Sequence, residues 1–353
     1  MSLTLVEQMP NCLRMPTVFF GGGRCLLEKS YRLLLLGIAI AASPLVSAAP
    51  VTALAFSSDG GVLVSNGDRS LEIRSAKDAV VLRRIICDLP KITTLAFSPD
   101  GRWLVAGGGE AGVRGEARVL AWPEGKAVHH FTNHTDLVTK VSFDASGGRI
   151  AIASSDHSVR VLRMSETGNL VELFPLIGHA GPVLAVAFSP GGKGLVTASA
   201  DRSLKVWSTE DGRLLRTFSQ HTEAIHALAF RPWKAQDAWP VFCASGSDDR
   251  TVRVWQPEIG RMVRIVRGHG AAIFALAWSA DGSSLFSTGK EGVIRRIDAD
   301  SDTIEAQWRA HDDWIYALAL SPDGTRLASG DWKGAIRLHD PGRDSDPEFR
   351  KGP

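Results

Sequence analysis

Short segments in which apolar and polar or small side chains alternate recur along the chain from Val51 onward. Each is six residues long and opens with Val or Ile, and six of the seven close with Phe or Trp. The seven segments are 51–56, 92–97, 138–143, 183–188, 225–230, 273–278 and 315–320. Their last residues are separated by 41 to 48 positions. A period of two with β-branched and aromatic residues predicts one β-strand in each repeat.

The residues after each segment predict three more strands. Most segments run into a turn such as Ser98-Pro-Asp-Gly101 or Ser321-Pro-Asp-Gly324. Pro presets φ in such a turn, Asp caps it and Gly accepts a positive φ. A second strand, a short acidic turn, a third strand and a fourth strand follow before the next repeat. Four strands per repeat at this period are typical of blades arranged radially around an axis.

Two repeats carry matched sets of polar and aromatic residues. The sets are His179, Ser199, Asp201 and Trp207 in the fourth repeat, and His221, Ser247, Asp249 and Trp255 in the fifth. With the Gly-His pairs between repeats, this pattern resembles the WD-repeat β-propeller family over about residues 51–340. The resemblance implies an all-β fold of seven blades, each a four-stranded antiparallel sheet. It also implies that each set forms a buried hydrogen-bond chain, which would satisfy the imidazole and indole N–H groups.

Other repeats depart from the family pattern. Leu162, Ile297 and His339 stand where the third, sixth and seventh repeats would carry Trp, and the first two repeats lack the His. We expect these blades to have weaker internal networks within the same fold.

The N-terminus has the organisation of a secretory signal. Basic residues precede the apolar run 33–42, and small residues fill 43–49. We therefore expect 1–49 to be a signal peptide, 50–342 the propeller and 343–353 a polar tail. An exported, periplasmic or extracellular protein with no transmembrane span after signal removal would follow. Alternatively, the segment is retained in a cytoplasmic protein, and residues 39–45 supply the fourth strand that the seventh repeat lacks.

Composition excludes several classes of protein. The net charge is +2, from 40 basic and 38 acidic side chains, which gives no basic surface for nucleic acid. Cys87 and Cys243 stand alone in apolar segments, and no Cys/His spacing fits a metal site. Hydrolase motifs such as Gly-x-Ser-x-Gly are absent. We predict no catalytic residue, no metal and no cofactor.

The family resemblance implies that three positions in each blade contact partners on one face of the ring. Carried over to this chain, these positions concentrate aromatic and charged side chains on the last two blades. The predicted partner-binding residues are Phe274, Trp314, Tyr316, Trp332, Lys290 and Asp312, with His226 and Leu184 at the equivalent strand position of earlier blades. Half-exposed aromatic rings with charged neighbours are the composition of a binding hot spot.

These observations predict a monomeric, non-catalytic platform that binds a protein or peptide through one face. Two alternatives remain open at this point. One is a periplasmic propeller enzyme of the hydrolase or lactonase type, with a metal in the central channel. The other is an intracellular assembly scaffold that is never exported. The insertion 231–240, with Trp233 and Trp239, could be a second contact region or could cover the edge of a blade.

Overall fold

The computed structural model describes residues 49–232 and 241–342. The predicted signal sequence up to residue 48, the alternative closing strand at 39–45 and the tail 343–353 lie outside the described residues. Trp233 and Trp239 of the insertion do so too.

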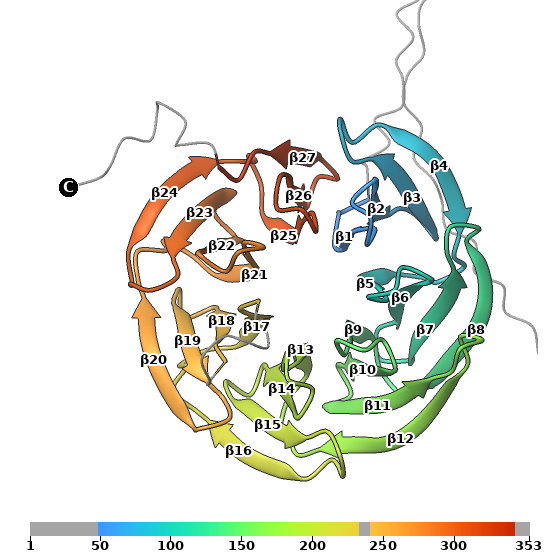
Figure 1. Ribbon diagram of the computed structural model, residues 1–353, viewed down its shortest axis with the longest axis horizontal. Coiled ribbons are helices and arrows are strands. Elements are labelled where there is room, and N and C mark those ends of the chain that lie inside the picture. The colour runs from blue at the N-terminus through green and yellow to red at the C-terminus, as the bar shows by residue number, and fades with distance from the viewer. Residues whose placement is uncertain (1–48, 233–240, 343–353) are drawn as a thin grey trace, which may run out of the picture. The chain divides into compact units, whose positions relative to one another are not determined.

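The described residues form seven antiparallel sheets, the blades, arranged around a common axis (Figure 1); the pocket that their inner strands line near this axis is called the channel. Blade 1 consists of β1 (Leu54–Phe56), β2 (Val62–Asn66), β3 (Ser70–Ser75) and β4 (Val81–Ile86). Blade 2 consists of β5 (Ile92–Phe97), β6 (Trp103–Glu110), β7 (Arg114–Ala121) and β8 (Lys126–His134). Blade 3 consists of β9 (Val138–Phe143), β10 (Arg149–Ser154), β11 (Ser158–Met164) and β12 (Leu170–Ile177). Blade 4 consists of β13 (Val183–Phe188), β14 (Gly194–Ser199), β15 (Leu204–Ser208) and β16 (Leu214–Phe218).

The remaining three blades complete the ring. Blade 5 consists of β17 (Ile225–Phe230), β18 (Cys243–Ser247), β19 (Val252–Gln256) and β20 (Arg261–Val266). Blade 6 consists of β21 (Ile273–Trp278), β22 (Ser284–Gly289), β23 (Val293–Asp298) and β24 (Ile304–Arg309). Blade 7 consists of β25 (Ile315–Leu320), β26 (Leu327–Asp331) and β27 (Ile336–His339). The prediction of an all-β, seven-bladed propeller is confirmed, and blade 7 shows three strands within the described residues.

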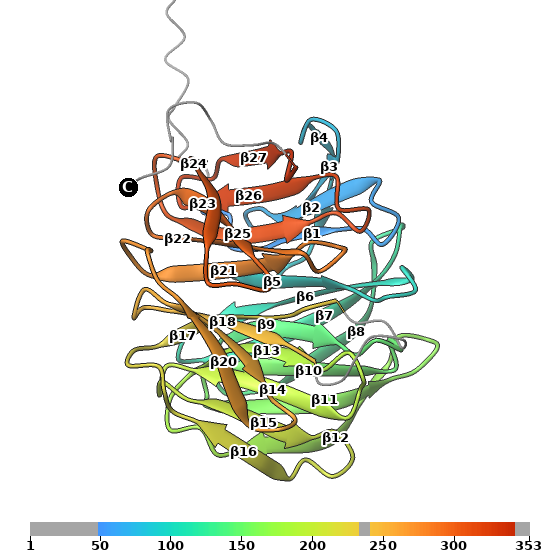
Figure 2. The same ribbon diagram turned by 60° about the vertical axis from the view of Figure 1, so that its left-hand side comes forward.

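The first strand of each blade lies next to the channel, and the fourth lies at the outer edge (Figure 1); Figure 2 shows the same stack of strands obliquely. In six blades the pairing of the inner strand with its neighbour slips between its first and third residues, as between Ile225 and Ala227. This β-bulge takes the second residue out of the regular ladder and redirects its side chain. That second residue is therefore placed at the rim of the channel.

The hydrophobic core lies between blades. One cluster joins Val206 and Phe218 of blade 4 to Ile225 and Trp255 of blade 5. Trp255 retains 1% of its surface exposed. A four-stranded sheet cannot bury two apolar faces alone, so each blade depends on both neighbours for stability.

A chain of buried hydrogen bonds crosses blade 4. His179 contacts the Asp201 carboxylate through Nδ1 at 2.8 Å and the Thr197 hydroxyl through Nε2 at 2.7 Å. The Trp207 indole N–H donates to the same hydroxyl at 2.9 Å. Blade 5 repeats this arrangement with His221, Asp249, Ser245 and Trp255. Both networks therefore contain the predicted His, Asp and Trp side chains.

The prediction that Ser199 and Ser247 join His to Trp is wrong. Ser199 instead donates to the carbonyl of Gly181, and Ser247 donates to that of Glu223. Residues 197 and 199 share one face of β14, so alternation alone does not distinguish them. Trp207 pairs directly with Leu195, which brings the indole closer to Thr197 than to Ser199.

Blade 7 builds a network of the same kind without Trp. His311 contacts Asp331 at 2.9 Å and Ser329 at 2.7 Å, and the Ser329 hydroxyl contacts His339 Nε2 at 2.8 Å. His339 thus replaces the indole that the family pattern would place there. In blade 6, His269 contacts Ser287, but its Nδ1 is buried without a hydrogen-bond partner.

Burial and hydrogen bonding shift the pKa values of these groups. Burial lowers the pKa of His179 and His221 although their Asp partners oppose the shift. Burial, helped by the nearby Arg295, lowers the pKa of His269 to about 4. Burial would raise the pKa of Asp201, but hydrogen bonds, including those from Ser203 and His179, outweigh it and hold the pKa at about 2.

Replacing Thr197 with Val tests the hydroxyl at the centre of the blade 4 network. The variant leaves the Trp207 N–H and His179 Nε2 buried without partners, which we expect to lower the free energy of unfolding by about 2–3 kcal/mol. Chemical denaturation measures this loss. Thr217→Val, at an exposed position of β16, is the matched control and should change little. Equal stability of the two variants would contradict the role assigned to Thr197.

Acid should destabilise the propeller first through its buried histidines. A histidine whose pKa is lowered by folding contributes stability that is complete above its unfolded value of 6.5 and is lost as pH falls toward the folded value. For His269 this window runs from pH 6.5 to about 4, with a slope of at most about 1.4 kcal/mol per pH unit. We expect His269→Gln to reduce the slope of unfolding free energy against pH in this window. An unchanged slope would show that His269 is not buried as a neutral group.

Candidate functional site

The bulged position of the inner strands divides the ring into two halves. In blades 1–3 it holds threonine, and in blades 4–7 it holds larger side chains. The threonines form hydrogen bonds between blades: Thr52 donates to Ile92 O at 2.7 Å, Thr139 donates to Val183 O at 2.5 Å, and Thr93 donates to Val138 O. In blades 1–3, the side chain at the predicted partner-contact position therefore forms a hydrogen bond to the next blade.

Blades 5–7 instead carry five rings in contact, which we call the aromatic row. Its members are His226, Phe274, Trp314, Tyr316 and Trp332. His226 meets Phe274 edge to face at 5.2 Å between centroids, and Phe274 stacks on Tyr316 at 4.8 Å with an interplanar angle of 6°. Tyr316 lies 5.4 Å from Trp332 and 6.2 Å from Trp314. Offset stacking and edge-to-face contacts are the favoured geometries of aromatic pairs.

Two indoles of the aromatic row are open to solvent. Trp314 is 37% exposed and Trp332 is 48% exposed. The backbone N–H of Trp332 donates to the carbonyl of Trp314 at 2.9 Å, which fixes the two loops of blade 7 against each other. A surface that is both apolar and rigid is therefore presented to solvent.

Charged groups flank the row. The Lys290 ammonium lies 4.5 Å from the centroid of Trp314, within the range of a cation–π contact. His226 and Asp248 approach to 2.9 Å, and Lys333 and Asp313 to 3.5 Å. The structure therefore brings together the four predicted aromatic residues, His226 and Lys290. Leu184 and the exposed Asp312 do not belong to these ring and charge contacts.

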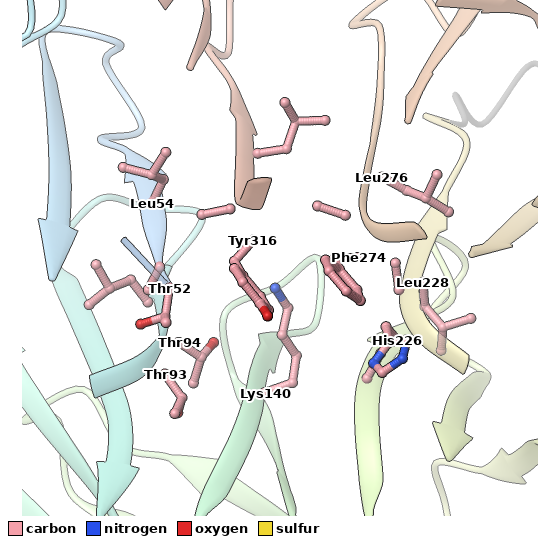
Figure 3. Close-up of a pocket in the computed structure, with 17 residues that line it drawn as sticks. Thr52, Leu54, Thr93, Thr94, Lys140, His226, Leu228, Phe274, Leu276 and Tyr316 are labelled. Atoms are coloured by element: carbon pink, nitrogen blue, oxygen red, sulfur yellow. The ribbon is translucent and has the colours of Figure 1, made fainter. Parts of the chain in front are cut away.

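Sequence reasoning missed Lys140, which points into the channel from β9 (Figure 3). It is the third residue of its inner strand, where the other blades carry small side chains. Those residues are Ala53, Thr94, Ala185, Ala227, Ala275 and Ala317. Comparing the seven repeats position by position would have revealed it as the one charged residue at this site. Burial within the ring lowers the pKa of its ammonium, although the channel leaves it open to solvent.

The channel mouth is small and short of acidic groups. About 70 Å³ of space remains there, bordered by Lys140, His226, Phe274, Tyr316 and inner-strand Thr, Ala and Leu side chains. Among the described residues, no group of three or more His, Cys, Asp or Glu is arranged to hold a metal ion. The described residues therefore provide no cluster of metal ligands of the kind that a propeller enzyme with a metal in its channel would need.

The cysteines of the propeller do not offer a nucleophile. Cys87 and Cys243 are buried and free. Burial raises the pKa of Cys87 to about 11 and also raises that of Cys243. Thiols in this state are protonated at neutral pH and act as small apolar side chains.

Three curated proteins illustrate what this chain is similar to. The COMPASS component SWD3 of Saccharomyces cerevisiae is 37% identical over 27% of this chain and 29% of its own length. WD repeat, SAM and U-box domain-containing protein 1 of Gallus gallus is 34% identical over 27% of the chain and 19% of its own length. Nuclear distribution protein PAC1 of Arthroderma benhamiae is 30% identical over 30% of the chain and 24% of its own length. The matches thus span less than a third of each relative.

These relatives contradict the expectation of an exported, periplasmic or extracellular protein. They include a COMPASS component and a nuclear distribution protein, whose names place them with proteins of the cell interior. Within residues 49–232 and 241–342, no helix is long and apolar enough to span a membrane.

The model of one protein family matches the chain seven times, once for each blade, and five of the matches begin at the outer strand of the preceding blade. Its description is "WD domain, G-beta repeat", and it matches residues 45–74, 85–114, 125–162, 170–208, 212–256, 260–298 and 303–340. Matches over most of the chain, together with seven sheets around one channel, show that this protein belongs to the WD domain, G-beta repeat family.

Proposed function

We propose that this protein is a non-catalytic scaffold that binds a protein or peptide partner across the aromatic row and Lys290 on blades 5–7. The proposal rests on the second residue of the inner strands, which has different roles in different blades. Threonine fills it with inter-blade hydrogen bonds in blades 1–3, whereas His226, Phe274 and Tyr316 turn it into a continuous ring surface in blades 5–7.

The physical character of this surface suits recognition. Tryptophan and tyrosine supply most of the energy of many protein interfaces, because they bury a large area at a low cost in side-chain entropy. The rings are already packed against one another, so a partner meets a surface that needs little rearrangement. Lys290 and Asp248 place charges of both signs beside the apolar rings, which can orient a bound segment.

The family and the relatives favour a scaffold over an enzyme. One relative is named as a component of a complex, which supports a place for this chain within a protein assembly. The hydrolase or lactonase alternative has no support from the relatives' names or from the ligand groups of the described channel. We therefore retain the assembly scaffold and set aside the propeller enzyme. In this proposal a single copy of the propeller binds the partner.

Selection of random displayed peptides on the full-length protein tests this function. We expect the selected peptides to lose affinity by about thirtyfold or more against Trp314→Ala or Trp332→Ala, because truncating a hot-spot indole costs about 2 kcal/mol or more. The melting temperature should barely change, since both side chains are partly exposed.

Ile86→Ala provides the matched control. Ile86 is 84% exposed on β4, at the outer edge of blade 1, and its loss should leave peptide affinity unchanged. Peptides that bind both tryptophan variants as tightly as the wild type would refute the proposed site.

A further inference from the structure

The Lys140 ammonium is a positive charge in the channel with no partner among the described residues. No hydrogen bond or ion pair joins it to them. Its side chain is exposed to the solvent of the channel mouth, so the ammonium is accessible to an anion that enters there. A carboxylate beside it would form a charge-assisted hydrogen bond that no described residue supplies.

The side chains around Lys140 cannot supply that anion. The other ionisable groups bordering the channel mouth are His226 and Tyr316, and neither carries a carboxylate. Asp248 already pairs with His226 at 2.9 Å. Burial, with Asp313 and Asp248 nearby, raises the pKa of Tyr316, so its phenol is neutral at physiological pH.

We propose that Lys140 anchors a carboxylate of the bound partner, from an acidic side chain or a C-terminus, inside the channel mouth. The identity of the partner segment rests on the proposed function, whereas the carboxylate site itself does not. While the segment lies across the aromatic row, its carboxylate enters the channel and forms a charge-assisted hydrogen bond with the ammonium.

The dimensions and donors of the site favour a carboxylate over other groups. The space of about 70 Å³ at the mouth is sufficient for a side-chain terminus such as a carboxylate. Phosphate is usually held by several donors, commonly the forked guanidinium of arginine, and no arginine borders this mouth. A lysine or arginine of the partner would meet the ammonium at close range and be repelled.

Small molecules test the site without any knowledge of the partner. With alanine methyl groups labelled with ¹³C, NMR resonances of Ala275 and Ala317 report directly on the channel mouth. We expect sodium acetate to shift these resonances saturably, and acetamide, its neutral counterpart of similar shape, to leave them unchanged.

Two variants assign the effect to Lys140. Lys140→Met should abolish the saturable acetate shift, whereas Lys126→Met, at an exposed position of β8, should retain it. Comparison of the melting curves of both variants confirms that each is folded. Absence of saturable acetate shifts in the wild type, or equal shifts in Lys140→Met, would overturn the proposal.

The selected peptides then test whether the partner uses the site. For peptides that bind through Trp314 and Trp332, each Glu or Asp is replaced by Gln or Asn, and the C-terminus is amidated in a separate series. We expect one of these changes to weaken binding to the wild type by about tenfold or more and to have no effect on Lys140→Met. The series that responds shows whether the carboxylate comes from a side chain or from the C-terminus.

The outcomes distinguish this inference from the proposed function. Peptides that need the tryptophans but no carboxylate would support the scaffold and overturn the role of Lys140. Saturable acetate binding lost in Lys140→Met, with no peptide dependent on the tryptophans, would support the anion site and refute the interaction surface. Stronger binding of a phosphoserine peptide than of its glutamate counterpart would overturn the choice of carboxylate.

Discussion

Each blade of this propeller can bury its apolar faces only against the two blades beside it. Val206 and Phe218 of one sheet pack with Ile225 and Trp255 of the next, and clusters of this kind recur around the ring. No sheet is stable alone, so the stability of the whole depends on contacts between neighbours. Because these contacts fix the strands beside the channel, they also hold the loops and the bulged residues at its rim in defined positions.

The rim shows how one structural position can serve either stability or recognition. Thr52, Thr93 and Thr139 use their hydroxyl groups to hold adjacent inner strands together. Phe274 and Tyr316 cannot make such bonds, and their rings pack on each other instead. A partner meeting blades 5–7 therefore encounters side chains held by mutual ring contacts on a backbone that the ring has already ordered, which limits the entropy lost on binding.

The repeats made the fold predictable, because the period, the turn residues and the alternation all agree with one architecture. Details within a blade were harder to predict. Thr197 and Ser199 lie on the same face of one strand, and only the register with Trp207 identifies the residue that bonds the indole. His339 breaks the family pattern, yet it restores the hydrogen bond that Trp would have made.

The sequence predicted the aromatic residues of the candidate site but not Lys140. The aromatic residues stood out because four of them fall at the partner-contact positions of the last two blades. Lys140 did not, because a lysine in a strand is usually a solvated side chain, and its direction depends on the closure of the ring. The expectation of export came from a local pattern at residues 33–49, and the relatives contradict it.

The β-bulge has a consequence for how such a ring can be altered. Its residue lies outside the ladder of the sheet, so exchanging that side chain disturbs neither strand pairing nor the core between blades. In blades 4–7, where the position makes no bond to the next blade, new side chains can be introduced one blade at a time. In blades 1–3 the same exchange removes an inter-blade hydrogen bond. A designer seeking a new specificity would therefore begin with Leu184, on the blade beside His226, where the aromatic row ends.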